Sequence, residues 1–351
     1  MNTGTEDILP QDDFIPEDGS LPDEAESDAD VRHVHFKASK TQTRRIDQFL
    51  TDRLPYLSRA AVQRLIDDGM ATVNGKPTKA SYKIKAGDEV EMVAPPEPVN
   101  DLVPEPIPLD IVYEDEHFLA LNKQANLIVH PARGRWTGTL VNGLVYYGKK
   151  WSNVNGDWRP GILHRLDRNT TGIMLVAKSD EAHWRIARQF ENRTIQKTYV
   201  AVIHGIPELL SDVIDAPIGK DKYNRERQAL RKEINGGKPA VTKYEVQEKF
   251  EAGRAKFAFI KLWPKTGRTH QLRVHMTSQG HPMVGDNMYG GRVVEWEGGR
   301  FERQALHAHE ITFVHPATLK TMTITASLPP DITELLRILR AGLSPKVVEA
   351  V

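Results

Sequence analysis

Hydrophobic residues recur at helical spacing in two short stretches that follow a polar N-terminal segment. RRIDQFLTDRL (44–54) and SRAAVQRLIDDG (58–69) each place their apolar side chains on one stripe, which predicts an amphipathic helix in each. Ser58 can cap the second helix, and Gly69 can end it.

Alternating hydrophobic and polar residues come next, and they predict short strands. ATVNGKPT (71–78) fits a strand that turns at Asn74-Gly75, and KAGDEVEMV (85–93) fits another turn and strand. Together with the two helices, they predict one small α/β module. Three basic residues stand off its apolar stripe: Arg45, Arg59 and Arg64.

The segment APPEPVNDLVPEPIPLD (94–110) is rich in proline and has no hydrophobic period, which predicts an extended linker. We therefore expect four parts in the chain. These are an N-terminal tail (1–31), a small domain (32–94), the proline-rich linker (95–110) and a large domain (111–351).

From residue 111 onward, the pattern is that of many short strands. The β-branched and aromatic runs include IVYED, FLALNK, GIMLVAK, KTYVAVIHG, VTKYEVQEKF, AKFAFIKLWP and LHAHEITFVH. Helical patterns are fewer and occur at 139–148, 180–192 and 270–280. Because strands outnumber helices and do not alternate with them, we expect the α+β class, with a mixed, largely antiparallel sheet and flanking helices.

The charge balance separates the first 31 residues from the rest of the chain. They hold 11 of the 47 acidic residues and no lysine or arginine, so we expect a disordered acidic tail. The rest carries all 47 lysines and arginines against the remaining 36 acidic residues. Such a basic body is typical of nucleic-acid-binding proteins, although a basic soluble enzyme would show the same balance.

Composition excludes several kinds of site and location. The chain has no cysteine, which excludes disulfides, thiolate metal sites and cysteine nucleophiles. No apolar run approaches the ~20 residues of a membrane helix, and the acidic N-terminus does not resemble a signal or transit peptide. We therefore expect a soluble, cytoplasmic protein with no membrane partner.

Common cofactor and nucleophile motifs are absent as well. The chain has no P-loop, no glycine-rich dinucleotide fingerprint and no Gly-x-Ser-x-Gly elbow. His270 and His275 are five residues apart, whereas a helical metal pair needs a spacing of four. His307 and His309 share the face of a predicted strand, but no third ligand is evident. We therefore predict neither a metal nor a cofactor.

The small module resembles the S4 RNA-binding domain through RRIDQFL, LSRAAVQRLIDDGMATVNGK and IKAGDEV (44–93). S4 domains usually present their second helix and its basic residues to structured RNA. The resemblance implies RNA contacts from Arg45, Arg59 and Arg64. A solvated helix face is an equal alternative for each of these arginines.

The large domain resembles the RluA family of RNA pseudouridine synthases over roughly residues 106–330. The resemblance rests on HRLDRNTTGIMLVAKS (164–179), KTYVAVIHG (197–205), TGRTHQLRVHMTSQGHPMVGDNMYG (266–290) and QALHAHEITFVHP (304–316). Its most specific motif is His-Arg-Leu-Asp. Within the family, PIPLDIVYEDE, GKPAVTKYE and HPMVGDNMYGG, with the S4-like module, are similar to large-subunit ribosomal RNA synthases of the D type. The resemblance implies a pseudouridine synthase fold and the isomerisation of uridine in RNA without a cofactor.

The resemblance also implies roles for four residues. Asp167 matches the family's catalytic aspartate, and Arg273 matches the arginine that pairs with it. Tyr199 matches the tyrosine that stacks on the target base and is a candidate proton acceptor, so the resemblance implies that catalysis needs Asp167, Tyr199 and Arg273. Arg165 corresponds to the residue that inserts where the base leaves the stack. Taken alone, Tyr199 could be an ordinary core tyrosine and Arg165 an ordinary surface arginine.

The most basic stretch outside the S4-like module is GKDKYNRERQALRK (219–232). We expect a loop there whose cations contact RNA phosphates, with a solvated loop as the alternative. Its candidate contacts are Lys220, Lys222, Arg225, Arg227 and Arg231.

Three positions depart from the family pattern. Gln124 and Asn126 stand where the family usually has Pro and Gly, which leaves the detail of that loop open. Asn169 stands where an aspartate is common, so we expect modestly different electrostatics around Asp167.

The expected partner is therefore large-subunit ribosomal RNA, free or in an assembling particle, and we expect a monomer. Two other functions remain open: a non-catalytic RNA-binding or assembly factor, and a hydrolase with paired carboxylates. A binding factor would have no reason to keep Asp167, Tyr199 and Arg273 together. The hydrolase lacks a second acid in the apolar vicinity of Asp167.

Overall fold

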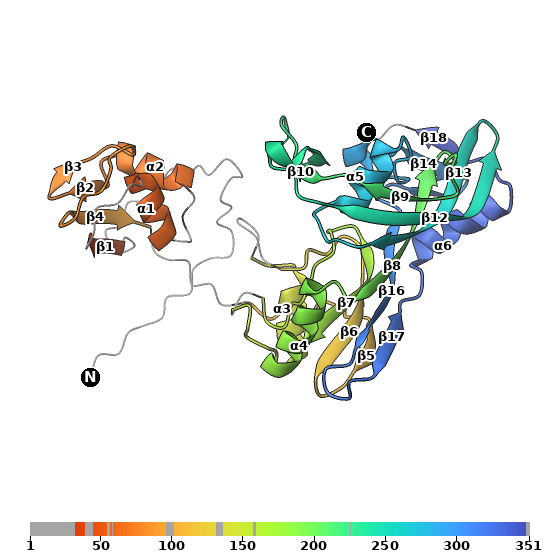
Figure 1. Ribbon diagram of the computed structural model, residues 1–351, viewed down its shortest axis with the longest axis horizontal. Helices are drawn as coiled ribbons and strands as arrows, with labels where there is room; N and C mark the ends of the chain where they lie inside the picture. Colours follow the sequence, from red (N-terminus) through yellow and green to blue (C-terminus); the bar gives the residue numbers. More distant parts are fainter. Residues whose placement is uncertain are drawn as a thin grey trace. The chain divides into compact units, whose positions relative to one another are not determined.

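The computed structural model describes two compact units of the chain (Figure 1). The described residues are 32–38, 45–54, 57, 59–95, 102–130, 136–156, 159–224 and 226–348, so the expected acidic tail (1–31) lies outside them. The first unit comprises residues 1–101 with 132–136, and the second comprises residues 102–131 with 137–351. Each unit has a hydrophobic core of its own.

In the first unit, two helices pack on a four-stranded sheet of order β1-β4-β2-β3. The elements are β1 (Arg32–Lys37), α1 (Ile46–Arg53), α2 (Arg59–Asp67), β2 (Ala71–Val73), β3 (Lys76–Pro77) and β4 (Glu89–Ala94). Both predicted helices are present, and the predicted Asn74-Gly75 turn joins β2 to β3. Strand β1 was not predicted, because its RHVHFK sequence is too polar to stand out.

The two helices are joined by a buried carboxylate. Asp47 on α1 has a fully buried side chain, and it accepts hydrogen bonds from Arg45, Arg59 and Gln63 at 2.6–3.1 Å. Burial alone would raise the pKa of Asp47, but the hydrogen bonds from Gln63, Arg59 and Arg45 lower it below its usual value. Arg45 and Arg59, which were predicted to contact RNA, thus also stabilise the fold.

The second unit is built on a nine-stranded sheet of order β5-β6-β7-β16-β8-β13-β12-β9, with β17 paired to β16. Strands β7 and β16 are parallel and the other neighbours are antiparallel, so the expected mixed, largely antiparallel α+β fold is confirmed. The strands are β5 (Ile111–Glu114), β6 (Phe118–Lys123), β7 (Thr171–Ala177), β8 (Gln196–His204), β9 (Ser211–Asp215), β12 (Val241–Ala252), β13 (Ala255–Pro264), β16 (Leu306–Val314) and β17 (Thr321–Thr325).

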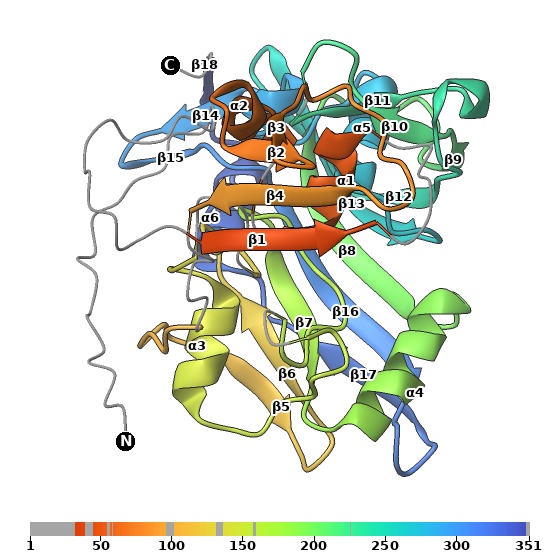
Figure 2. The same cartoon turned by 90° about the vertical axis from the view of Figure 1, so that its left-hand side faces the viewer.

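Four helices cover this sheet, two on each half. Helices α3 (Leu140–Tyr147) and α4 (Asp180–Glu191) lie on either side of β6 and β7 (Figure 2). Helices α5 (Gln271–Ser278) and α6 (Pro330–Arg340) pack on opposite faces of β8, β13 and β12. Alternate residues of β6 and β7 therefore enter two different cores, as do those of β8 and β13, which explains why these central strands are largely apolar.

Smaller elements complete the second unit. Strands β10 (Ile218–Lys220) and β11 (Gln228–Leu230) form a hairpin, and β14 (Val293–Trp296), β15 (Gly299–Phe301) and β18 (Lys346–Val348) form a three-stranded sheet. Two single 3₁₀ turns are η1 (Glu233–Asn235) and η2 (Asn287–Tyr289). The expectation of a loop at 219–232 was therefore wrong for both ends of that stretch. Backbone pairing joins Ile218 to Leu230 and Lys220 to Gln228, which forms the two strands of the hairpin.

The proline-rich segment is anchored where the structure describes it. Residues 102–110 form neither helix nor strand, but Leu102, Ile107 and Leu109 pack against the core beside α3. The Asn142 side chain donates to the Val103 carbonyl at 2.9 Å, and Gly138 N donates to the Glu105 carboxylate at 2.7 Å. This part of the segment is therefore bound to the second unit.

The two halves of the large sheet meet where β7 pairs with β16, and a glycine permits the contact. Thr171 and Gly172 pair with His307 and Ala308. Gly172 has a φ of 117°, and a Cβ atom there would lie 2.2 Å from the Ala308 carbonyl oxygen. Only glycine fits this approach, and the loop that precedes β7 is thereby fixed at the junction of the two halves.

Candidate active site

Asp167 lies in the loop that enters β7, at the junction of the two halves of the sheet. Its carbonyl accepts a hydrogen bond from Thr170 N at 3.0 Å, which closes a turn, while Leu166 is buried in the core beneath it. The Asp167 side chain is partly exposed, with a fractional exposure of 22%. The loop therefore presents the carboxylate instead of burying it.

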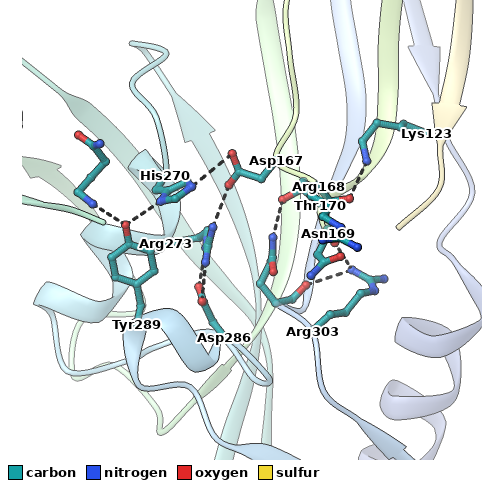
Figure 3. A network of polar contacts seen from close by, with 12 residues as sticks. Lys123, Asp167, Arg168, Asn169, Thr170, His270, Arg273, Asp286, Tyr289 and Arg303 are labelled. Atoms are coloured by element: carbon teal, nitrogen blue, oxygen red, sulfur yellow. Dashed lines mark hydrogen bonds and ion pairs between the residues drawn. The ribbon is translucent and has the colours of Figure 1, made fainter. Parts of the chain in front are cut away.

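Two cationic side chains bind the backbone of this loop (Figure 3). Lys123, at the end of β6, is fully buried, and its ammonium donates to the carbonyls of Gln124, Leu127 and Arg168 at 2.8–3.0 Å. Burial lowers the pKa of Lys123 to about 7, while the nearby charge of Asp167 opposes the shift. Arg303 donates to the Asn169 carbonyl at 3.0 Å and is itself held by Asp331 of α6.

Arg273, on α5, joins Asp167 to a second carboxylate. Its Nη1 lies 3.2 Å from Asp167 Oδ2, while Nε and Nη2 each donate to Asp286 at 2.7 Å. The guanidinium is buried and lies 4.8 Å from the centre of the Tyr289 ring. Although burial alone disfavours the charged form, Asp286 and Asp167 raise the pKa of Arg273, so it is a fixed cation.

The ion pair with Arg273 uses only one oxygen of Asp167 and leaves the other, Oδ1, available. Oδ1 makes no hydrogen bond to the described residues, and His270 Nε2 lies 3.9 Å from it. Asp286, in contrast, uses both oxygens on Arg273. Asp286 is therefore not available as the second acid that a hydrolase with paired carboxylates would need beside Asp167.

Asp167 opens onto a cavity of about 920 Å³ in the second unit. Tyr199 on β8, Arg165 and Arg273 line the same cavity, so the structure brings these residues together with Asp167. Lysines and arginines that line the cavity outnumber its carboxylates, six to two. The six basic residues are Arg165, Arg193, Lys197, Lys265, Arg268 and Arg273, and the two carboxylates are Asp167 and Glu191. This surplus of positive charge suits an anionic polymer.

Tyr199 forms part of the apolar wall of the cavity. Its ring packs against the cores on both sides of the sheet junction. Burial, together with the charge of Asp167, raises the pKa of Tyr199 well above its ordinary value. The phenol is therefore neutral at physiological pH, which suits a stacking surface better than a base.

The other predicted RNA-binding residues lie in both units. Arg45 and Arg59 pair with Asp47 and remain partly exposed, while Arg64 is exposed on α2. In the β10–β11 hairpin, Lys220 ends β10 and is exposed, and Lys222 is exposed in the turn. Arg225 lies outside the described residues.

Arg227 differs from the two hairpin lysines. It is partly buried, and its guanidinium lies 5.3 Å from the centre of the Tyr289 ring. Arg227 therefore packs toward the Asp167 site rather than standing in solvent. Arg231, directly after β11, is also partly buried.

Two of the three departures from the family pattern lie close to Asp167 and are accommodated locally. Asn126 adopts a left-handed φ of 59°, which asparagine tolerates better than most residues, and its side chain accepts from Arg168 Nε at 2.8 Å. Asn169 binds Arg303 through its backbone carbonyl. Neither change disturbs the Asp167–Arg273 pair.

Three residues of the site were not singled out from the sequence: Asp286, Tyr289 and His270. All three lie within motifs that carry the family resemblance, GHPMVGDNMYG and GRTHQLRVH. The available signal was Arg273 itself, because a buried guanidinium has five donors and one carboxylate satisfies only part of them. No group of three or more potential metal ligands comes together in the described chain, and no helix in that part is long and apolar enough to cross a membrane.

Comparison with known proteins places the chain in a family. Residues 117–278 match the family model for RNA pseudouridylate synthase, and residues 44–90 match the S4 domain. An uncharacterized RNA pseudouridine synthase of Bacillus subtilis, YlyB, is 42% identical over 312 residues, which cover 88% of this chain and 99% of the relative. The chain belongs to the RNA pseudouridine synthase family. It is thus an isomerase that acts on RNA.

Other matches agree with this assignment. The ribosomal large subunit pseudouridine synthase D of Neisseria meningitidis serogroup A is 41% identical to this synthase, over 85% of this chain and 80% of the relative. Among solved structures, human RNA pseudouridylate synthase domain containing 1 matches with a TM-score of 0.52 and 28% identity, over 70% of this chain and 91% of that one. The expected fold and enzyme class are therefore confirmed.

Proposed function

We propose that this synthase converts uridines of large-subunit ribosomal RNA to pseudouridine, with Asp167 as its catalytic carboxylate. Support for the substrate comes from relatives named ribosomal large subunit pseudouridine synthase D. Support for the residue comes from one observation: Asp167 faces a basic cavity with Oδ2 held by Arg273 and Oδ1 open.

The reaction needs little beyond these groups. The N1–C1′ bond of uridine breaks, the base rotates, C5 bonds to C1′, and the hydrogen lost from C5 is balanced by one gained at N1. Arg273 binds one oxygen of Asp167 and orients the carboxylate, which can then bond to the base, bond to the sugar or accept a proton. Each role needs the open Oδ1 next to the nucleotide.

The remaining cavity residues accommodate the flipped nucleotide. Tyr199 offers a neutral ring on which the base can stack. Arg165 is exposed at the cavity and is free to enter the RNA stack where the base has left. In the same proposal, the S4 module and the β10–β11 hairpin contact RNA phosphates through Arg45, Arg59, Arg64, Lys220, Lys222, Arg225 and Arg227. We further propose that the synthase acts as a monomer in the cytoplasm.

The decisive experiment maps pseudouridines by mass spectrometry in ribosomal RNA from cells that lack the gene. We expect specific pseudouridines to disappear, to return with the wild-type gene and to stay absent with Asp167→Asn. If the deletion strain keeps every pseudouridine, large-subunit RNA is not the substrate. If Asp167→Asn restores modification, Asp167 is not the catalytic group. A pure binding factor would predict no loss at all.

A further inference from the structure

His270 stands between Asp167 and the β10–β11 hairpin. It immediately precedes α5 in a left-handed conformation, with a φ of 55°, and its side chain is largely buried. One ring nitrogen, Nε2, lies 3.9 Å from Asp167 Oδ1, and the other, Nδ1, lies 2.8 Å from Tyr289 Oη (Figure 3). The imidazole thus lies between the open oxygen of Asp167 and the Tyr289 hydroxyl.

The hydrogen bonds around Tyr289 determine where the His270 hydrogen lies. The backbone N–H of Gln228, at the start of β11, donates to Tyr289 Oη at 2.8 Å. A backbone N–H can only donate, and His270 Nδ1 is the other polar partner of this hydroxyl within the described chain. The phenolic hydrogen therefore points to Nδ1, which accepts it. A neutral imidazole must then carry its own hydrogen on Nε2, facing Asp167.

The charged form of His270 fits these surroundings less well. Burial lowers the pKa of His270; Asp167 and Asp286 oppose this shift, while Arg273 and Arg165 add to it. A protonated ring would also turn an Nδ1–H toward Tyr289, whose oxygen already receives the Gln228 N–H. The Tyr289 hydroxyl hydrogen would then lose its acceptor, or the His270 Nδ1–H and the Gln228 N–H would compete for Tyr289 Oη.

We propose that His270 is a positioning residue that orients Oδ1 of Asp167, and that Tyr289 and the hairpin residue Gln228 set its tautomer. The proposal rests on the catalytic role of Asp167 put forward above. At 3.9 Å the Nε2–H attracts Oδ1 without a full hydrogen bond, and such contacts often tighten once substrate is bound. The opposite tautomer would present a lone pair to the carboxylate and repel it.

The tautomer can be measured without RNA. A long-range ¹H–¹⁵N spectrum of the full-length protein labelled at histidine distinguishes the Nδ1–H, Nε2–H and doubly protonated forms. Comparison with His270→Asn assigns the His270 signal among the 13 histidines, and asparagine tolerates the left-handed backbone. We expect the Nε2–H form at pH 7, and a shift toward the Nδ1–H form in Tyr289→Phe. An Nδ1–H or charged ring in the wild type, or no change in Tyr289→Phe, would overturn the proposal.

The consequence for catalysis is measured by single-turnover kinetics on an unmodified large-subunit RNA transcript. Tyr289→Phe keeps the ring beside Arg273 and removes only the hydroxyl. We expect its rate constant to fall on the order of tenfold while its affinity for RNA stays the same. The matched control is Tyr146→Phe, which changes an exposed tyrosine of α3 and should alter neither value.

The outcomes separate this proposal from the proposed function. An unchanged rate in Tyr289→Phe, or a loss of affinity in place of rate, contradicts the positioning role of His270. If the wild type does not modify the transcript, or if Asp167→Asn remains active, the proposed substrate or catalytic residue is wrong. The tautomer measurement holds in both cases, because it requires neither RNA nor turnover.

Discussion

At the scale of single residues, the site depends on one guanidinium that satisfies two carboxylates at once. Arg273 uses two nitrogens on Asp286 and a third on Asp167. A lysine carries the same charge but has no planar fork, so it cannot make both contacts in this geometry.

We therefore predict that Arg273→Lys lowers the turnover rate about 100-fold, because Asp167 loses its fixed orientation. The free energy of unfolding should fall by roughly 3 kcal/mol, since the buried Asp286 loses its bidentate partner. Arg340→Lys is the matched control, because Arg340 also binds a carboxylate through two nitrogens, but on the exposed side of α6. Single-turnover assays and urea unfolding of both variants measure the effects. Equal losses in the two variants would refute the special role of Arg273.

Lys123 gives a prediction about pH. In the unfolded chain this lysine titrates at 10.5, and in the folded protein burial lowers its pKa to about 7. Between these pH values the unfolded chain binds more protons, so this residue makes stability rise with pH, by at most about 1.4 kcal/mol per pH unit. We expect Lys123→Met to remove this rise.

The measurement compares the urea midpoints of wild type and Lys123→Met at several pH values between 7 and 10. The difference in urea midpoint between the two proteins should change with pH. All other titrating groups are common to both proteins, so the change reports on Lys123 alone. Lys123→Met should also reduce activity, because three carbonyls of the Asp167 loop and its neighbours lose their donor. A constant difference across this range would show that Lys123 stays charged.

The residue scale also shows what sequence patterns can and cannot give. Asp167, Tyr199, Arg165 and Arg273 were predicted through motifs, and the structure brings them to one cavity. Asp286 was not, because its importance depends on a contact with Arg273 that motif spacing does not reveal. Arg45 and Arg59 were expected to contact either RNA or solvent, but both also form ion pairs with the buried Asp47.

At the scale of elements, the β10–β11 hairpin connects a basic turn to the site. Its turn carries Lys222, while its second strand supplies the Gln228 N–H that binds Tyr289. The hairpin was expected as a loop, because its charged residues hide the short paired ends in the sequence. Helix α6 was not predicted, although its sequence contains the pattern of an amphipathic helix. Pro330 stands at its start, and its buried face carries Ile332, Leu335, Leu336 and Leu339.

Removing the positive charges of the hairpin should lower the affinity for RNA and make that affinity less dependent on salt. For the double variant Lys220→Gln/Lys222→Gln, we expect the slope of log affinity against log salt to fall by about 0.7 for each RNA phosphate that the variant no longer neutralises. The control is Lys249→Gln/Lys346→Gln, which removes two exposed lysines outside the hairpin and the cavity. Filter binding at several salt concentrations measures both. If the two variants have equal slopes, the hairpin lysines do not contact the RNA backbone.

At the scale of the whole molecule, the S4 module and the catalytic unit have separate cores, so the module can be removed. The cores of the second unit contain no residue before Leu102. Deletion of residues 1–94 should leave the catalytic unit folded and weaken RNA binding about 10- to 100-fold, because one of two linked binding modules is removed. Turnover should become more sensitive to salt.

Kinetics over a range of RNA and salt concentrations test this deletion, with full-length Asp167→Asn as a binding control that keeps the module. Unchanged activity after the deletion would remove the S4 module from substrate recognition.

The whole-molecule topology was the least predictable level. Seven of the nine strands of the large sheet were predicted, all but β9 and β17, and so was its largely antiparallel class, yet the order of the strands was not. Strand β16 lies between β7 and β8 although it follows them by more than 100 residues. Hydrophobic alternation shows that a strand is buried, but it does not specify the neighbour with which it pairs.

That central parallel pairing has a consequence for how the protein acquires its activity. The halves of the sheet meet through His307 and Thr171, which are 136 residues apart, so a long chain must close before they join. The β12–β13 hairpin and the β6–β7 pair form over shorter separations and can precede that step. On refolding, fluorescence from the six tryptophans should therefore recover before catalysis, with assembly of the Asp167–Arg273 bridge as a late event.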